Sequence, residues 1–286
     1  MAKSTVYFTK EISSDSLLRI YRTLGVQLKE KVAVKLSTGE PGGHNFLQPG
    51  MIKELVKEVN GTIVECNTAY GDPRSKTKSH WEVMKKHGFL EIAPCDIMDG
   101  EKEIALEIIG GKHLKQNFVG ANLQNYGSVL ILSHFKGHVM GGFGGALKNM
   151  SIGIASAHGK SQIHNAGGFL GISKQNAFLE AMAEACKSVV DYMGSENIVY
   201  INVANRLSVD CDCDSNPAEP KMADIGILAS TDPVAVDQAC VDAVYRSPDE
   251  GKKDLIKRIE SRNGIHTIEA AEILGLGSRE YEIVEI

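Results

Sequence analysis

Cysteine, aromatic residues and long apolar runs are all scarce in this 286-residue chain. It has six cysteines, one tryptophan and 6% aromatic residues. Six scattered cysteines are too few to form the disulfide framework of a protein this long, so we expect reduced thiols. No stretch approaches the roughly 20 apolar residues of a membrane span, and the first residues lack the apolar core of a signal peptide. We therefore expect an intracellular, cytoplasmic protein without membrane contact.

The charge is also modest, at −5, with 31 basic and 36 acidic residues. No dense stripe of lysine and arginine is present, which argues against a nucleic-acid partner. A content of 43% hydrophobic and 23% charged residues is ordinary for a globular protein, and 286 residues are enough for one large domain. No repeat or linker marks a boundary. We therefore expect a single α/β domain over residues 1–286, or two closely packed lobes.

Short β-branched runs alternate with helix-like segments along the chain. Strands are predicted at 4–9, 31–36, 61–66, 104–109, 129–132, 198–203 and within 223–231, and helices at 15–28, 51–59, 78–87, 144–155, 176–192 and 233–245. Asp232 is predicted to cap the last helix, with Pro233 at its first position. Asp237 is interpreted as an exposed residue of that helix, with a buried acid directed at the edge of the sheet as the alternative. This alternation predicts a mixed or mainly parallel sheet with helices on both faces, in Rossmann-like layers.

Residues 133–149, SHFKGHVMGGFGGALKN, follow a predicted buried strand and precede a predicted helix. In α/β proteins such a turn lies at the carboxyl edge of the sheet, where ligands bind. His134 and His138 are four residues apart, so a helical turn would place both imidazoles on one face, where they could share a metal ion. The alternative is a polar loop whose histidines only bond the backbone.

The same stretch contains a glycine-rich run that allows close backbone approach to a ligand. Lys136 and Lys148 add positive charge, which suits an anion. The predicted anion cradle comprises Gly141, Gly142, Gly144 and Gly145.

A Cys-x-Cys pair, Cys211 and Cys213, lies in the segment SVDCDCD at 208–214. Two thiolates this close can bind one thiophilic ion. The three aspartates of the segment are expected to raise the pKa of an unmetallated thiol. The alternative is an acidic surface loop with two incidental cysteines.

Two further polar segments offer ligand-binding candidates. Lys35 and His44 lie in the loop after the second predicted strand, and His158 and Lys160 lie in SAHGKSQIH at 156–164. That second segment is not a phosphate-binding P-loop, because its glycine spacing is wrong and it follows a helix. The glycine run GGFGGA likewise does not match a dinucleotide-binding fingerprint. A plain connecting loop remains the alternative for residues 35–49.

Several blocks together resemble the family catalogued as domain of unknown function 362, in the order of that family and over nearly the whole chain. The blocks are VAVKLSTGE (32–40), HNFLQP (44–49), SHFKGHVMGGFGGALKN (133–149), HGK (158–160), VYIN (199–202), VDCDC (209–213), DIGILASTDPVAVDQA (224–239) and AAEILGLGSREYEI (270–283). Many members look like iron–sulfur proteins because a ferredoxin-like module is inserted in their second half. Here residues 165–175, NAGGFLGISKQ, contain no cysteine, so we expect no iron–sulfur cluster from this chain alone. The resemblance implies a fold and a polar crevice but no reaction.

The sequence thus predicts a metal-binding protein, which could be a metal-assisted enzyme that acts on a small anionic metabolite. The predicted metal ligands are His134, His138, Cys211 and Cys213, which suit zinc or iron. Lys136 and Lys148 are the predicted catalytic cations, stabilising developing negative charge. Two alternatives stay open. One is a non-catalytic module that binds a phosphate or another anion, and the other is an accessory or maturation protein with an iron–sulfur redox partner.

Overall fold

The computed structural model describes residues 3–168 and 173–286, and its centre is an eight-stranded sheet. The strand order is β12-β1-β11-β10-β7-β2-β3-β4. The strands are β1 (Ser4–Thr9), β2 (Val32–Lys35), β3 (Gly61–Glu65), β4 (Cys95–Ile97), β7 (Ser128–His134), β10 (Ile198–Ala204), β11 (Gly226–Ser230) and β12 (Tyr281–Glu285).

The strands of one half of the sheet, β10-β7-β2-β3-β4, all run parallel to one another. β11 pairs antiparallel with both β10 and β1, and β1 pairs parallel with β12. The sheet is therefore mixed and mainly parallel, as the alternation of elements predicted. β1 and β2 are consecutive strands along the chain, yet β11, β10 and β7 lie between them in the sheet.

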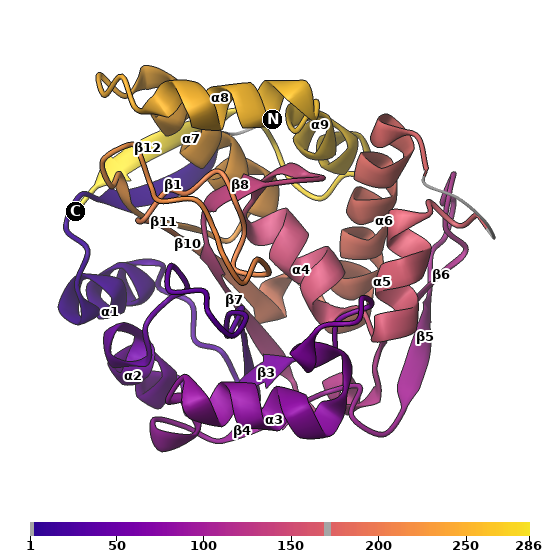
Figure 1. Ribbon diagram of the computed structural model, residues 1–286. Coiled ribbons are helices and arrows are strands. Elements are labelled where there is room, and N and C mark those ends of the chain that lie inside the picture. Colours follow the sequence, from indigo (N-terminus) through magenta and orange to yellow (C-terminus); the bar gives the residue numbers. More distant parts are fainter. Residues whose placement is uncertain (1–2, 169–172) are drawn as a thin grey trace.

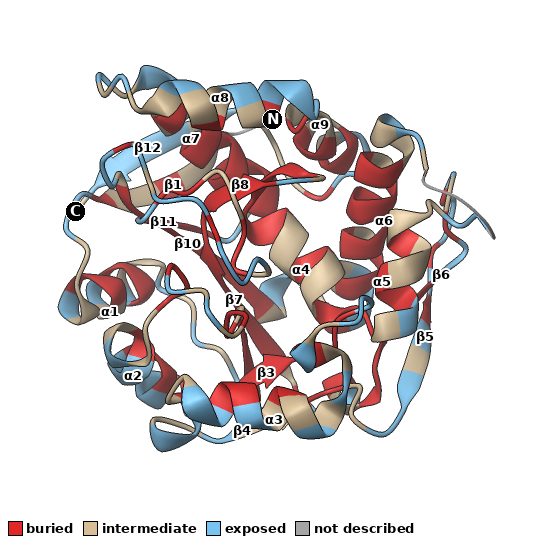
Figure 2. Cartoon of the chain, viewed as in Figure 1, coloured by how far each residue is buried: buried red, intermediate tan, exposed pale blue. Residues whose placement is uncertain are grey.

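Helices cover both faces of the sheet, and alternate residues of β7 show how (Figure 1). Leu130 and Leu132 belong to the core formed with α1 (Ser14–Thr23), α2 (Pro49–Glu58) and α3 (Thr77–Lys86). Val129 and Ile131 face the opposite way, into the core formed with α4 (Ala146–Ile154), α6 (Gln175–Met193) and α7 (Pro233–Arg246). Side chains alternate along a strand, so a continuous apolar run fills both cores. The central strands β7, β10 and β11 are buried along their whole length, whereas the edge strand β12 is mostly exposed (Figure 2).

Smaller elements surround these layers. They are the helices α5 (Ala157–His164), α8 (Lys252–Ser261) and α9 (Ile265–Ile273), the 3-10 turns η1 (Pro73–Ser75), η2 (Phe89–Glu91), η3 (Ala121–Asn125) and η4 (Ser195–Asn197), and the two-stranded pairs β5 (Glu103–Glu107) with β6 (Gln116–Gly120) and β8 (Lys136–His138) with β9 (Gly142–Gly144). Among the described residues, no helix is both long enough and apolar enough to cross a membrane.

Two local predictions have opposite outcomes. The Asp232 carboxylate accepts hydrogen bonds from the N–H groups of Val234 and Ala235, so the predicted cap of α7 is confirmed. The prediction of a helical turn between His134 and His138 is wrong, because residues 136–138 form strand β8 and pair antiparallel with β9. Residues 169–172 of the cysteine-free segment 165–175 lie outside the described residues.

Candidate metal and anion site

Polar side chains gather where the parallel strands end. Lys35 ends β2, Glu65 ends β3 and His134 ends β7, so all three lie at the carboxyl edge of the sheet. The segment after β10 crosses this edge, since Gly137 of β8 donates its N–H to the Ser208 carbonyl. Segments that are far apart in the sequence therefore converge at the edge where α/β proteins usually bind ligands.

Asp212 is the partner of both His134 and Lys136. Its carboxylate accepts a hydrogen bond from His134 Nδ1 at 2.8 Å and a second one from Lys136 Nζ at 2.7 Å. Burial by itself raises the pKa of Asp212, but the adjoining His134 and Lys136 outweigh burial and lower the pKa. His134 Nε2 donates to the Asn205 carbonyl at 2.7 Å. Both ring nitrogens of His134 thus face acceptors, which leaves no lone pair for a metal ion.

His138, Cys211 and Cys213 form the one cluster among the described residues whose His, Cys, Asp or Glu atoms are grouped for a metal ion. One ligand atom from each lies within 4.8 Å of the others. His138 and Cys211 are buried and Cys213 is partly buried. Of the four ligands predicted from the sequence, the structure brings these three together and places His134 elsewhere. Two thiolates and an imidazole suit zinc or ferrous iron, with a fourth position left for water or substrate.

The two thiols differ in their expected ionisation. A hydrogen bond from Cys213 lowers the pKa of Cys211 well below its usual range, and the nearby charges of Lys148 and Lys136 act in the same direction against burial. The same hydrogen bond and burial raise the pKa of Cys213. Lys148 Nζ lies 3.6 Å from the Cys211 sulfur. The expectation of a raised pKa is therefore wrong for Cys211, because the hydrogen bond from Cys213, together with these lysines, outweighs burial and the neighbouring Asp212.

His138 makes a hydrogen bond that bears on metal binding. Its Nδ1 accepts from the Gly141 N–H at 2.8 Å, so this nitrogen carries no proton and Nε2 is the protonated one. A metal bound at Nε2 requires the proton to move to Nδ1, and a metal bound at Nδ1 takes the lone pair that Gly141 uses. The donor set fits a metal ion, but binding it requires the Gly141 hydrogen bond to break.

Two of the lysines here have no carboxylate partner among the described residues. Lys148 has the Cys211 sulfur as its hydrogen-bond acceptor. Lys160 is buried and donates to the carbonyls of Ala155 at 2.5 Å and Cys66 at 3.5 Å. Burial lowers the pKa of Lys160. An anion placed between these two lysines would neutralise both charges.

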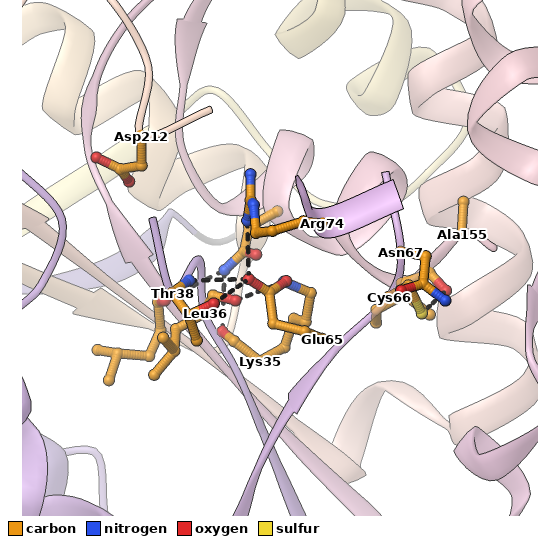
Figure 3. Close-up of polar contacts among 12 residues, drawn as sticks. Lys35, Leu36, Thr38, Glu65, Cys66, Asn67, Arg74, Ala155 and Asp212 are labelled. Atoms are coloured by element: carbon orange, nitrogen blue, oxygen red, sulfur yellow. Dashed lines mark hydrogen bonds and ion pairs between the residues drawn. The ribbon is translucent and has the colours of Figure 1, made fainter. Parts of the chain in front are cut away.

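The other cations are already paired. Glu65 accepts from Lys35 at 2.9 Å and from Arg74 at 3.3 Å, and Arg74 also bonds to Glu40 (Figure 3). Burial by itself raises the pKa of Glu65, but Lys35 and Arg74 lower it to about 2. This charge cluster is a rigid wall of the site rather than a free anion receptor.

Only two of the four glycines predicted to form the anion cradle line the cavity. Gly144 and Gly145 line a cavity beside Lys136 and Lys148, whereas Gly141 lies in the turn between β8 and β9. Gly142 begins β9. The first N–H groups of α4, from residues 146 and 147, donate to the carboxylate of Asp237 at 2.7 and 2.9 Å. These backbone donors are therefore taken by the protein itself.

Two predicted ligand-binding histidines lie apart from this cavity. His44 is exposed and bonds to Glu219 at 3.1 Å. His158 pairs with Glu103 at 2.9 Å and packs its ring on Phe118. Neither faces the lysines described above, while the predicted residues Lys35 and Lys160 do line the cavity.

Four residues of the site were not predicted from the sequence. They are Glu65, Tyr70, Arg74 and Asp212. The first three belong to the end of β3 and the polar loop after it, NTAYGDPRS, which occupies the same edge position as the loops that were selected. The position of this loop after a predicted strand was the sequence feature from which these three residues could have been predicted. Asp212 stands between the two cysteines and was considered only as a source of negative charge.

A family model described as "Domain of unknown function (DUF362)" matches residues 32–242. No curated protein matches the chain. A lactate racemase apoprotein structure from Thermoanaerobacterium thermosaccharolyticum has a TM-score of 0.49 and 13% identity, over 83% of this chain and 56% of that one. A crystal structure of a Thermotoga maritima protein gives 0.46 and 11%, over 81% and 58%. This chain thus spans less than two thirds of either protein, and likeness at this level does not extend to activity or ligand.

Proposed function

Because the chain belongs to the DUF362 family, whose domain carries no assigned reaction, we propose a function from its own site: binding of a transition metal and of a small anion beside it. The observation that carries the proposal is the convergence of His138, Cys211 and Cys213 next to Lys148 and Lys160. No other part of the described chain groups nitrogen and sulfur ligands in this way.

The chemistry follows from this donor set. A divalent metal held by two thiolates and one neutral imidazole carries no net charge, and three protein ligands leave a position for a reacting oxygen. His138, Cys211 and Cys213 would hold the metal, which would supply Lewis-acid chemistry at this position. Lys148 and Lys160 would then hold the anionic group of the substrate and offset charge that develops beside the metal. We propose zinc or iron as the metal and metal-assisted catalysis on a small anionic metabolite as the activity.

One observation favours a second candidate, a module that binds an anion without metal. The Nδ1 lone pair of His138 is already used by Gly141, and Lys148 already neutralises the Cys211 thiolate. In this alternative the cysteines only adjust the charge of the cavity. An accessory role with an iron–sulfur redox partner stays a prediction.

The deciding experiment is elemental analysis of the full chain purified without chelator, beside a Cys211→Ser/Cys213→Ser double variant. We expect a near-stoichiometric transition metal in the wild type and none in the variant. Cys95→Ser is the matched control, since Cys95 lies in β4 away from the site, and it should retain the metal. Absence of metal in all three proteins, also after anaerobic reconstitution with zinc and ferrous iron, would leave the metal-free alternative.

Amide hydrogen exchange of the same samples tests whether His138 is a metal ligand. Metal binding must break the Gly141 N–H hydrogen bond, so amide hydrogen exchange in the turn around Gly141 should become faster when metal is added. Exchange there that is unchanged in the metal-loaded wild type would mean that His138 is not a ligand.

A further inference from the structure

Two cavities meet at the thiol pair. One has a volume of about 80 Å³ and the other about 240 Å³. Both are lined by the same six side chains, which therefore form the wall or passage between them. These are Tyr70, Lys148, Ile152, Lys160, Cys211 and Cys213. The site is thus one bipartite space with the candidate metal ligands at its junction.

The two chambers differ in chemistry. The smaller one, called here the cationic chamber, adds Lys35, Arg74 and Lys136, whose carboxylate partners are Glu65, Glu40 and Asp212, and Glu65 itself also lines it. The larger one, called here the apolar chamber, adds Val139 and Met140. His138 and His164 also line the apolar chamber, and His164 stacks on Phe178 and donates through Nδ1 to the Lys160 carbonyl.

The acidic residues of the apolar chamber have partners of their own. Asp210 pairs with Arg258 at 3.3 Å and accepts from the Ala218 N–H. Asp214 accepts from the Asn216 N–H at 2.8 Å. The exposed Val139, the neighbouring Met140 and the shared Ile152 form the apolar part of this lining, which is where an apolar substituent is favoured.

The volume of the smaller chamber and the lysines on the shared wall indicate which part of a ligand each chamber binds. A space of about 80 Å³ exceeds the roughly 10–15 Å³ that one water molecule needs, so a small carboxylate or phosphate group fits in it. Lys148 and Lys160, which lack carboxylate partners among the described residues, stand on the shared wall. The charged group of a ligand is thus held in the cationic chamber, and whatever it carries must extend past the thiols into the larger space.

We infer that the ligand of this site is an amphipathic small anion, with a carboxylate or phosphate head in the cationic chamber and a short aliphatic or aryl group in the apolar chamber. This inference rests on the proposed function and narrows its substrate class. A consequence is that the metal, at the junction, faces the atoms adjacent to the anionic head, so the reaction occurs next to that head rather than at the far end of the ligand.

The test measures dissociation constants by calorimetry for two series of probes on the full chain. The probes are acetate, butyrate, hexanoate and octanoate, and methyl, butyl and hexyl phosphate, which separate the two kinds of head. Each buried methylene is expected to tighten binding by about two- to fourfold until the apolar chamber is filled. The series with the tighter shortest member identifies the head.

Three variants locate the two parts of the ligand. Val139→Asn/Met140→Gln should abolish the chain-length dependence and leave acetate binding within about twofold. Ile273→Gln, an exposed apolar residue on α9, is the matched control and should keep the full dependence. Lys148→Met/Lys160→Met should weaken every probe at least tenfold.

The outcomes separate this inference from the proposed function. Equal affinities along each series, or a dependence that survives Val139→Asn/Met140→Gln, would overturn the amphipathic ligand and leave anion binding intact. Failure of every probe to bind the wild type, or binding unaffected by the double lysine variant, would overturn the anion site itself and with it this inference.

Discussion

At the scale of single residues, Asp237 stabilises the helix that presents the site. Its buried carboxylate accepts from two N–H groups at the start of α4 and from Asn202 Nδ2 at 2.7 Å. Burial raises its pKa to about 6. Gly145 is required at the preceding position, because a Cβ there would collide with the same carboxylate. α4 carries Lys148, so this cap positions a cation of the site.

Replacing Asp237 with alanine should therefore lower the free energy of unfolding by about 3 kcal/mol, because buried donors lose their acceptor. Chemical denaturation at pH 7 measures the change. Asp191→Ala, at an exposed acid on α6, is the control and should change stability by less than about 0.5 kcal/mol. A loss equally small for Asp237→Ala would contradict the capping role.

The sequence could not place Asp237 or the histidines, although it contained a partial signal. Both an exposed and a buried position stayed open for Asp237, because the acceptor role depends on β10 and α4, which are distant in the chain. His134, Lys136 and His138 alternate with the buried Phe135, a period of two that is typical of a strand rather than a helical turn. Weighing that period would have predicted extended structure at 134–138. It would still have left unknown which histidine meets the cysteines.

At the scale of elements, one buried charge cluster joins the ends of β2 and β3 to η1. Lys35 comes from β2, Glu65 from β3 and Arg74 from η1 (Figure 3). A carboxylate whose pKa falls on folding contributes stability above its unfolded pKa, and that contribution is lost as the pH falls toward its folded pKa. For Glu65 this window runs from 4.5 down to about 2.

Glu65 should therefore contribute about 3 kcal/mol that disappears across that window. Urea unfolding of wild type and Glu65→Gln from pH 6 to pH 2.5 tests this, because the variant cannot titrate at this position. The difference in stability between the two should shrink as the pH falls. Burial raises the pKa of nearby Glu40, and the charge of Glu65 raises it further. Both proteins are therefore also compared in a Glu40→Gln background, where the change with pH at this cluster comes from Glu65. A constant difference would show that folding does not lower the pKa of Glu65.

Elements were predicted better than their arrangement. Apolar runs and the Asp232-Pro233 cap are local patterns, so six of the eight strands of the main sheet were found with small errors at their ends. The edge strands β4 and β12 and the helices α5, α8 and α9 were not predicted, and the predicted strand at 104–109 belongs to the separate β5–β6 pair. The first helix, for instance, was predicted to reach residue 28 and ends at Thr23. The hairpin of β8 and β9 was missed because its strands are three residues long and rich in glycine. The position of β1 beside β11 was not predicted, since strand order depends on pairings between distant segments.

At the scale of the whole molecule, the site depends on the complete fold. His138 lies in β8, and Cys211 and Cys213 lie in the segment between β10 and β11, so a bound metal links parts of the chain about 70 residues apart. Lys160 comes from α5 and Tyr70 from the loop after β3. The unfolded chain retains only the Cys-x-Cys pair, and a metal ion should therefore bind the folded protein much more tightly than the unfolded one.

Metal should consequently stabilise the entire fold. At a free metal concentration 100 times the dissociation constant, the free energy of unfolding should rise by up to about 2.7 kcal/mol, less whatever the unfolded thiols bind. Thermal unfolding of the apo and reconstituted protein measures the shift, which should appear in one transition because the ligands come from both sides of α4 and α6 in the sequence. Cys95→Ser should behave like wild type, and Cys211→Ser/Cys213→Ser should show no shift. An equal shift in the double variant would place the stabilising metal at other residues.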